Sequence, residues 1–466
     1  MIKDEILKKK PQTDPFKILS PTAILGYGFP QESFINGINE KPDLIAVDAG
    51  STDPGPYYLG AGVSFTDRTG VKRDLRYMIK AGIENKIPVV ISSAGGSGAK
   101  PHMDWCENII LEIAKEEKLN FKLGLIYSDI DKNVIKKSID AGKIEAMDGI
   151  APLTKTAVDE TPNIVAQMGV EPIIEALKKG CDIILAGRAY DPAPFSALPI
   201  MLGYDTALAT HLGKILECAA IAADPGSGSD CALGILKKDS FILKPLSKDR
   251  VFTEQSVAAH SLYEKSDPMF LPGPGGTLDL RGVTFRSIGN GEVEVSGTKF
   301  IEANPYKIKL EGSKIVGYRT MTIAGTHDPI MIENIDEILI KAKERALSIL
   351  EKENIKGDIF FHVYGKNGVM GYLEPINKVF SYEIGILIEV VAKTQEIANT
   401  ICSIVRSTLL HYGYEGRIST AGNLAFPFSP SDIKMGPVYE FSIYHLMPID
   451  DFSLFPVYTK EINFKE

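Results

Sequence analysis

The sequence predicts an α/β protein with a doubly wound, mostly parallel sheet, a β-rich extension and a small C-terminal α+β domain of ferredoxin-like type. Up to about residue 200, short apolar runs alternate with segments of helical length, as in parallel sheets covered on both faces by helices. Polar and apolar residues then alternate over about 233–330, and the rest of the chain mixes strands with helices. We therefore expect domains at 1–232, 233–352 and 353–466.

The parallel strands are predicted from runs that are apolar throughout. They lie at 22–25, 43–47, 87–92, 122–127 and 182–186, with a weaker sixth at 145–150. The intervening segments 103–115 and 163–179 are long enough to be the crossover helices that parallel strands need.

Beyond residue 232, stretches such as 292–295 and 307–310 have the period of two that is typical of antiparallel strands. Residues 272–276 (PGPGG) form a turn-rich link. In the C-terminal part we expect helices at 335–352 and 394–411, with strands at 359–364, 382–391 and 439–445. The β-α-β order there is the basis for the ferredoxin-like prediction.

Charge and cysteine content limit the classes of partner. The chain has 466 residues, 51 Lys+Arg and 60 Asp+Glu, for a net charge of −9, whereas nucleic-acid binders usually carry a basic excess. The five cysteines form no CxxC pair, which favours a reducing compartment. The charged N-terminus lacks the apolar core of a signal peptide, and no apolar run approaches the roughly 18 residues of a membrane helix. We expect a cytoplasmic protein that binds neither nucleic acid nor membrane, and its size favours a homo-oligomer.

Each predicted strand is followed by a loop rich in glycine or aspartate. These loops are 26–28, 48–53, 93–98, 128–131 and 187–191. Ligands of open parallel sheets bind beyond the carboxyl ends of the strands. The sequence therefore predicts one crevice lined by these loops.

Two of the loops predict binding of a small anionic substrate. Gly95, Gly96, Ser97 and Gly98 lead into a helix, whose free N-terminal amides attract carboxylates or phosphates; the alternative is a tight turn without a ligand. Arg188 follows an apolar strand, and its planar fork suits a substrate carboxylate; an internal ion pair with Asp191 or Asp129 is the alternative. Ser51 and Thr52 complete the predicted binding set.

Carboxylates on the same loops are candidates for acid–base or metal chemistry. Asp48 and Asp53 lie on one short loop, where they could hold a hard cation or act as acid and base; hydrogen bonds to their own loop are the alternative. Asp48, Asp129 and Asp191 are the candidate ligands of a Mg²⁺ ion. The sequence has no zinc or iron–sulfur motif of standard spacing.

Other residues are candidates for acid–base catalysis or for binding a dinucleotide. Glu217 and His260 are candidate acid–base residues. Gly26 and Gly28, with Asp48 about 20 residues further on, begin like a dinucleotide fingerprint, but Gln31 stands at the third glycine position.

The loops also carry a family resemblance. Residues 48–60 (DAGSTDPGPYYLG), 93–98 (SAGGSG) and 186–192 (AGRAYDP) resemble the acyclic terpene utilisation protein A family. The likeness covers about 21–327, and the tail resembles that family's small ferredoxin-like domain. It implies a role in degrading branched acyclic compounds, whose intermediates are carboxylic acids or their coenzyme A esters.

These observations favour a hydro-lyase, a hydratase or dehydratase, that acts on a small branched or unsaturated hydroxy-acid or dicarboxylic acid, or its coenzyme A thioester. We expect Asp53 as the base, Tyr57 or His260 as the acid, and Arg188 as the carboxylate clamp. Two alternatives remain open: a non-catalytic ligand-binding or scaffold subunit that works with a partner subunit, and an NAD-dependent oxidoreductase.

Overall fold

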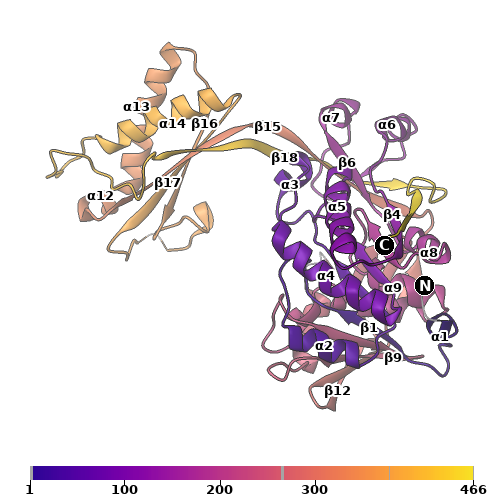
Figure 1. Ribbon diagram of the computed structural model, residues 1–466. Coiled ribbons are helices and arrows are strands. Elements are labelled where there is room, and N and C mark those ends of the chain that lie inside the picture. The colour runs from indigo at the N-terminus through magenta and orange to yellow at the C-terminus, as the bar shows by residue number, and fades with distance from the viewer. Residues whose placement is uncertain (1–3, 264–266, 377, 465–466) are drawn as a thin grey trace. The chain divides into compact units, whose positions relative to one another are not determined.

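The computed structural model describes residues 4–263, 267–376 and 378–464, and it confirms a mixed α/β protein (Figure 1). Contacts divide the chain into two compact units, residues 1–314 with 441–466, and residues 315–440. The division into domains at 1–232, 233–352 and 353–466 stays a prediction.

A ten-stranded sheet forms the centre of the first unit. Its five middle strands are parallel and lie in the order β1 (Phe16–Ser20), β2 (Leu44–Asp48), β3 (Val89–Ser92), β7 (Ile183–Ala186) and β4 (Phe121–Ile126). Antiparallel strands extend both edges: β8 (Ala232–Leu236), β9 (Ser240–Pro245), β13 (Glu292–Ser296) and β12 (Thr284–Gly289) beside β1, and β19 (Val457–Ile462) beside β4.

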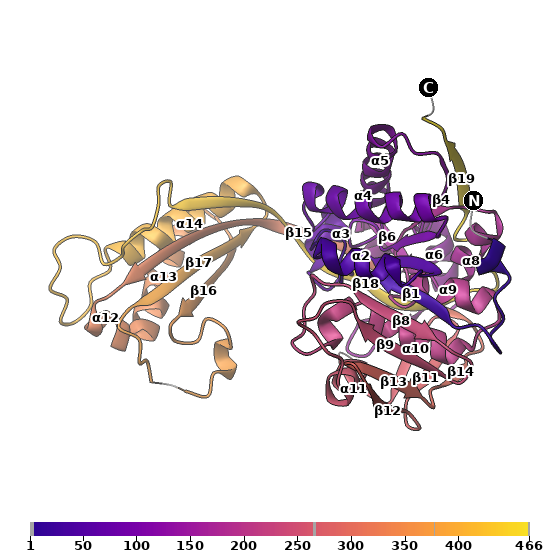
Figure 2. The same ribbon diagram turned by 60° about the horizontal axis from the view of Figure 1, so that its bottom comes forward.

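Helices pack on both faces of this sheet. Alternate strand residues such as Ile45 and Ala46 enter two separate apolar cores, as the period of two requires. One core includes α2 (Gln31–Asn39), α4 (Arg68–Asn85) and α5 (Lys100–Glu116), and the other includes α8 (Glu171–Lys178), α9 (Ala193–Met201) and α10 (Thr206–Leu216). Figure 2 shows α10 beside β8 and β9. The doubly wound topology remains our interpretation of this arrangement.

Two of the predicted core elements are wrong. The first strand is β1, and residues 22–25 form a turn after it, because it is the FKILS segment that pairs with both β2 and β8. Residues 163–179 are not one helix. They contain β6 (Asn163–Gln167), which pairs with β15 (Lys307–Thr326), and then α8. The weak strand at 145–150 is reduced to β5 (Glu145–Ala146), which pairs with β18 (Asp432–Pro448).

Smaller elements complete the first unit. The helices are α1 (Asp4–Leu7), α3 (Pro56–Ala61), α6 (Lys132–Asp140), α7 (Lys155–Glu160) and α11 (Glu254–Leu262). A three-stranded antiparallel sheet contains β10 (Phe270–Gly273), β11 (Gly276–Asp279) and β14 (Lys299–Glu302). The PGPGG segment supplies the turn from β10 to β11.

The second unit has strands in the order β16 (Gly357–Tyr364), β17 (Ile384–Ala392), β15 and β18. Helices α13 (Ile335–Lys352) and α14 (Gln395–Leu410) pack in one apolar core with this sheet, and α12 (Pro329–Glu333) precedes them. Helices α13 and α14 and strands β16 and β17 agree with the predicted ranges to within two residues, whereas β15 and β18 extend well beyond the predicted 307–310 and 439–445. The ferredoxin-like assignment itself stays a prediction.

One edge of the second unit is open and apolar. Within the described residues, β16 pairs only with β17. The segment that follows it exposes Val369, Tyr372, Phe380 and Tyr382 by 73% or more of their surface. Exposed edges and apolar patches of this kind mark interaction surfaces.

No helix among the residues that the structure describes is both long enough and apolar enough to cross a membrane.

Candidate functional site

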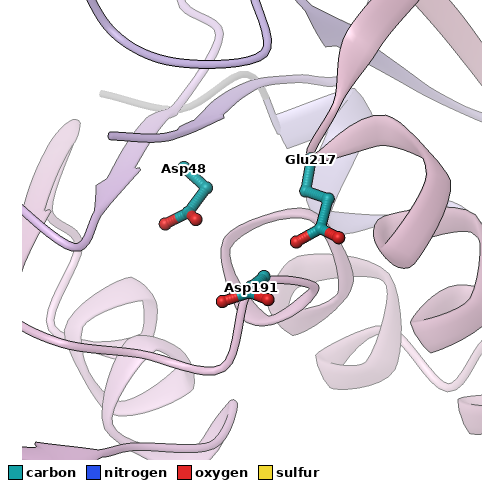
Figure 3. Close-up of side chains that lie close together, drawn as sticks. All are labelled: Asp48, Asp191 and Glu217. Carbon is teal, nitrogen blue, oxygen red and sulfur yellow. The ribbon is translucent and has the colours of Figure 1, made fainter. Parts of the chain in front are cut away.

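Three carboxylates from separate parts of the first unit converge at the carboxyl ends of the parallel strands. Asp48 is the last residue of β2, Asp191 follows β7, and Glu217 directly follows α10. One oxygen of each lies within 4.8 Å of the others (Figure 3). Asp48 and Glu217 are buried, whereas the side chain of Asp191 is 21% exposed. Oxygen ligands in this arrangement suit a divalent cation such as Mg²⁺.

The buried surroundings of Asp48 favour the neutral, protonated form of its carboxyl group. The hydroxyl of Ser92, the last residue of the neighbouring strand β3, donates a 2.7 Å hydrogen bond to Asp48 Oδ1. Burial raises the pKa of the Asp48 carboxyl to about 7, and the negative charge of Asp191 adds to this effect, while Arg188 opposes it. A carboxyl with this pKa can gain or lose a proton near neutral pH.

Glu217 is buried in direct contact with Lys214, one turn earlier on α10, and the two form an ion pair when Glu217 is ionised. Burial raises the pKa of the Glu217 carboxyl well above its usual range, despite the charge of Lys214. Burial alone would lower the pKa of Lys214, but Glu217 and Asp191 outweigh it and raise that pKa. Sequence reasoning missed Lys214, although a lysine inside the apolar segment TALATHLGKIL is a signal for a buried partner.

Arg188 is buried in an ion-pair network. Its Nε donates to Glu311 Oε2 at 2.7 Å, and its Nη1 donates to Asp191 Oδ1 and to Ser93 Oγ, each at 3.2 Å. Glu311 is fully buried on β15, and its Oε1 lies 2.7 Å from Lys309 Nζ. The pair between Arg188 and Asp191 is the predicted internal alternative to a substrate clamp, and the clamp stays a prediction.

The charges of this buried region do not cancel. The carboxylates are Asp48, Asp191, Glu217 and Glu311, and the cations are Arg188, Lys214 and Lys309. Three positive and four negative charges leave one negative charge in excess when all the groups are ionised. Because an uncompensated buried charge is costly, the cluster favours the uptake of a proton or a cation.

The Gly95 to Gly98 turn is buried, and Gly98 packs against the backbone of Gly187 and Arg188, directly after β7. The amides of Gly96 and Gly98 donate to the carbonyls of Ser93 and Ala94. The first amide of α5, that of Lys100, donates to Asp129 Oδ1 at 3.0 Å. A carboxylate of the chain itself therefore lies at the helix N-terminus where an external anion is predicted, and anion binding by Gly95, Gly96, Ser97 and Gly98 stays a prediction.

We expect Gly98→Ala to destabilise the first unit by about 2–4 kcal/mol, because the added methyl group would overlap the backbone of neighbouring buried residues. Gly98 has a φ of +69°, and a Cβ there would lie 2.5 Å from the Gly187 carbonyl carbon and 2.6 Å from Arg188 Cα. The control is Gly180→Ala, which also has a positive φ (+75°) but has no atom within 4 Å of the added Cβ. Gly180→Ala should lose only about 1–2 kcal/mol of stability, which is the cost of an alanine in a left-handed backbone conformation. Calorimetric melting of both variants checks this, and equal losses would contradict it.

The other predicted residues do not join the carboxylate cluster. Asp53 and Tyr57 are exposed, and the amide of Asp53 donates to Ser51 Oγ at 3.0 Å, which makes a local turn; Thr52 is buried. Burial, assisted by the charge of Lys214, lowers the pKa of His260 to about 4. His260 is therefore neutral at pH 7, which weakens its predicted role as an acid. Asp129 caps α5 and is absent from the metal-type cluster of the described residues.

The Gly26 loop has a structural partner of its own. The amides of Gly26 and Gly28 both donate to Asp74 Oδ2, at 2.8 and 3.0 Å. A dinucleotide needs such amides for its pyrophosphate. The geometry therefore gives no support to the NAD-dependent alternative.

Comparison with known proteins gives one family. The profile described as "Acyclic terpene utilisation family protein AtuA" matches residues 68–425, which is more than half of the chain. The match includes the motifs at 93–98 and 186–192 and also reaches into the second unit, whereas the motif at 48–60 precedes it. Searches of curated proteins and of solved structures give no match. The chain belongs to the acyclic terpene utilisation family, AtuA.

Proposed function

We propose that this protein takes part in acyclic terpene utilisation as a hydro-lyase, which adds water to, or removes it from, a small branched or unsaturated carboxylic acid or its coenzyme A thioester. The family supports the catabolic role. The carboxylate cluster supports the reaction type, because it places two carboxyl groups of raised pKa, Asp48 and Glu217, in one buried site.

Dehydration needs a base for a carbon-bound proton and an acid for the leaving hydroxyl. In the proposed step, the ionised Asp48 takes the proton from the carbon next to the carbonyl. Glu217, in its protonated form, gives its proton to the hydroxyl on the adjacent carbon. The C–O bond breaks, a C=C bond forms, and one molecule of water leaves. Asp48 ends protonated and Glu217 ionised, and a proton returns from the first to the second before the next turnover.

The surrounding charges suit this assignment. The ammonium of Lys214 pairs with Glu217 and stabilises it after it has lost its proton. Arg188 holds Asp191 beside the reacting pair. Asp191 is the most exposed of the three carboxylates, so we assign the substrate entrance to its side. These assignments replace Asp53 and Tyr57 of the sequence hypothesis with buried groups, and the variants Asp48→Asn and Asp53→Asn compare the two candidate bases directly.

The test is a solvent-exchange assay on the purified full chain. Branched unsaturated acids and their coenzyme A esters are incubated in heavy-oxygen water and, separately, in D₂O. A hydratase should place the heavy oxygen in the new hydroxyl and one deuterium on the carbon next to the carbonyl. Absence of both labels from every acid and ester would refute the hydro-lyase proposal.

The pH dependence provides a further prediction. Asp48 must be ionised to accept a proton, so turnover should rise as the pH increases through about 7. Glu217 must be protonated, and its raised pKa should make turnover fall again at higher pH. A bell-shaped profile of kcat/KM against pH is expected, with apparent pKa values that belong to the coupled pair. A profile that is flat from pH 5 to pH 9 would contradict this assignment.

A scaffold subunit is the second candidate function, and one observation favours it. The open edge of β16 and the exposed side chains of Val369, Tyr372, Phe380 and Tyr382 offer a surface for a partner subunit or a second copy of the chain. Light scattering gives the oligomeric state of the purified protein, and the label assay is repeated with it alone. Turnover without any other protein would exclude a purely scaffolding role.

A further inference from the structure

A separate cavity lies under the turn between β10 and β11. Its volume is about 350 Å³, within the range of small-molecule sites. Elements distant in sequence line it, and its side chains include Glu171, Tyr190, Thr206, Thr210, Phe300 and Tyr306.

The PGPGG turn packs closely against the aromatic walls of this cavity. A Cβ added at Gly273 would lie 2.6 Å from the ring of Tyr190, and one at Gly275 would lie 2.9 Å from the ring of Tyr306. A Cβ at Gly276 would overlap the ring of Phe300. Because these glycines lack side chains, their backbone packs directly against three aromatic rings. The turn is therefore a wall of the cavity as well as a link between strands.

Some polar groups of the cavity have hydrogen-bond partners, and others have none. Tyr306 donates a 2.8 Å hydrogen bond to Glu171 Oε2. Tyr190 is 8% exposed, and its hydroxyl has no hydrogen-bond partner among the described residues. The lining includes two acidic residues, the partly buried Glu171 and the exposed Glu302. It has no lysine, arginine or histidine among the residues that the structure describes there. The Glu171 carboxylate has no basic neighbour in this lining, and the Tyr190 hydroxyl has no hydrogen-bond partner there. The oxygen atoms of both groups can therefore accept hydrogen bonds from a ligand.

We propose that this cavity binds an organic ammonium group carried on a short apolar chain. The ammonium would pair with the Glu171 carboxylate and donate to the Tyr190 hydroxyl oxygen. The chain would lie against apolar lining residues such as Leu271 and Leu278. Aromatic walls favour cations as well, whereas the acidic lining repels carboxylates and phosphates.

The three clustered carboxylates are not part of the lining, but the cavity adjoins them, since Tyr190 directly precedes Asp191 and α10 contributes to both. Thr206, Thr210, Lys214 and Glu217 follow one another at intervals of four, four and three residues along α10, so they lie on one helix face. At 1.5 Å per residue, Thr210 and Glu217 are about 10 Å apart along the axis. The inference goes beyond the proposed hydro-lyase function and does not rest on it.

Three probes of matched shape test the charge of the ligand. Binding of butylammonium, butanol and butyrate to the full chain is measured by isothermal titration calorimetry. Butylammonium should bind about tenfold or more tightly than butanol, as expected for a charge-assisted hydrogen bond, and butyrate should not bind. Equal affinity for butylammonium and butanol, measurable binding of butyrate, or no heat with any probe would overturn the proposal.

Variants locate the binding to this cavity. Glu171→Gln should weaken butylammonium binding about tenfold or more. The control is Glu175→Gln on the same helix, since Glu175 is exposed and absent from the lining; it should leave the affinity unchanged. Tyr190→Phe keeps the ring, removes the hydroxyl and should also weaken binding, which decides the question if Glu171→Gln does not fold. Unchanged affinity in a folded Glu171→Gln or Tyr190→Phe protein, or an equal loss in Glu175→Gln, would overturn the proposal.

Discussion

Replacement of Asp48 by Asn is expected to lower kcat/KM by about 100- to 10,000-fold, the usual contribution of a general acid–base group. Asn has nearly the same shape, and its amide oxygen can still accept from Ser92 as Asp48 does, but it cannot take a proton from carbon. Steady-state kinetics with the best substrate of the label assay measures the effect.

Stability separates a chemical defect from a folding defect in this variant. The folded pKa of Asp48 is about 7, against an ordinary value of 3.8. Between these values the folded state binds more protons than the unfolded state, so the Asp48 contribution to stability falls as the pH rises from about 4 to about 7. Asn does not titrate. Asp48→Asn should therefore be at least as stable as the wild type at pH 8, and its stability should vary less with pH.

The matched control for Asp48→Asn is Asp53→Asn on the same loop. Asp53 is exposed and lies outside the carboxylate cluster. Its replacement should change kcat/KM by less than about threefold, which is the scale of a surface substitution of about 0.5 kcal/mol. If Asp53→Asn abolishes turnover while Asp48→Asn retains it, the base is Asp53, as the sequence hypothesis has it.

Replacement of Glu311 by Gln is expected to lower the free energy of unfolding by about 3–5 kcal/mol, the cost of breaking a buried ion pair by removing one partner. Glu311 is fully buried between Arg188 and Lys309, and Gln leaves two cations without their shared carboxylate. Calorimetric melting of the full chain measures the effect. Because Arg188 also holds Asp191, a folded Glu311→Gln protein should lose activity too.

The control for Glu311→Gln breaks an exposed ion pair of the same unit. Asp104 pairs with Lys100 at 2.7 Å on the surface of α5, where the two side chains are 46% and 62% exposed. Asp104→Asn should change stability by no more than about 0.5 kcal/mol, as is usual for surface pairs. A loss in Glu311→Gln no larger than in this control would show that the buried network does not stabilise the protein.

Much of the fold can be predicted from local pattern alone. The helix at 335–352 and the strands at 43–47 and 359–364 have clear apolar periods and clear ends, and the structure has α13, β2 and β16 there. The errors arise where partners distant in sequence decide the structure. The NIVAQ segment extends because β15 pairs with it, and β1 is fixed by pairing with β8, more than 200 residues away.

The candidate site shows the same limit. Asp48, Asp191 and Glu217 could each be selected from the sequence as candidate site residues. Two are carboxylates that follow predicted strands, and the third is a glutamate near a histidine. The grouping of Asp48 with Asp191 follows from their places at the carboxyl ends of parallel strands in one sheet, but the position of Glu217 beside them could not be predicted, because it depends on how α10 packs against the sheet. Glu311 was missed for the same reason: it lies on β15, far along the chain, and only tertiary packing places it beside Arg188.

The direction of helix α10 has a consequence for the proposed acid. Asp205 caps the start of this helix, and Glu217 follows directly after its last turn. Aligned peptide dipoles give a helix a partial negative charge at its carboxyl end. That charge repels an ionised Glu217 and attracts the ammonium of Lys214, which lies in the last turn. The helix that brings Glu217 to the site thus also favours its protonated form, the form from which the leaving hydroxyl would take its proton.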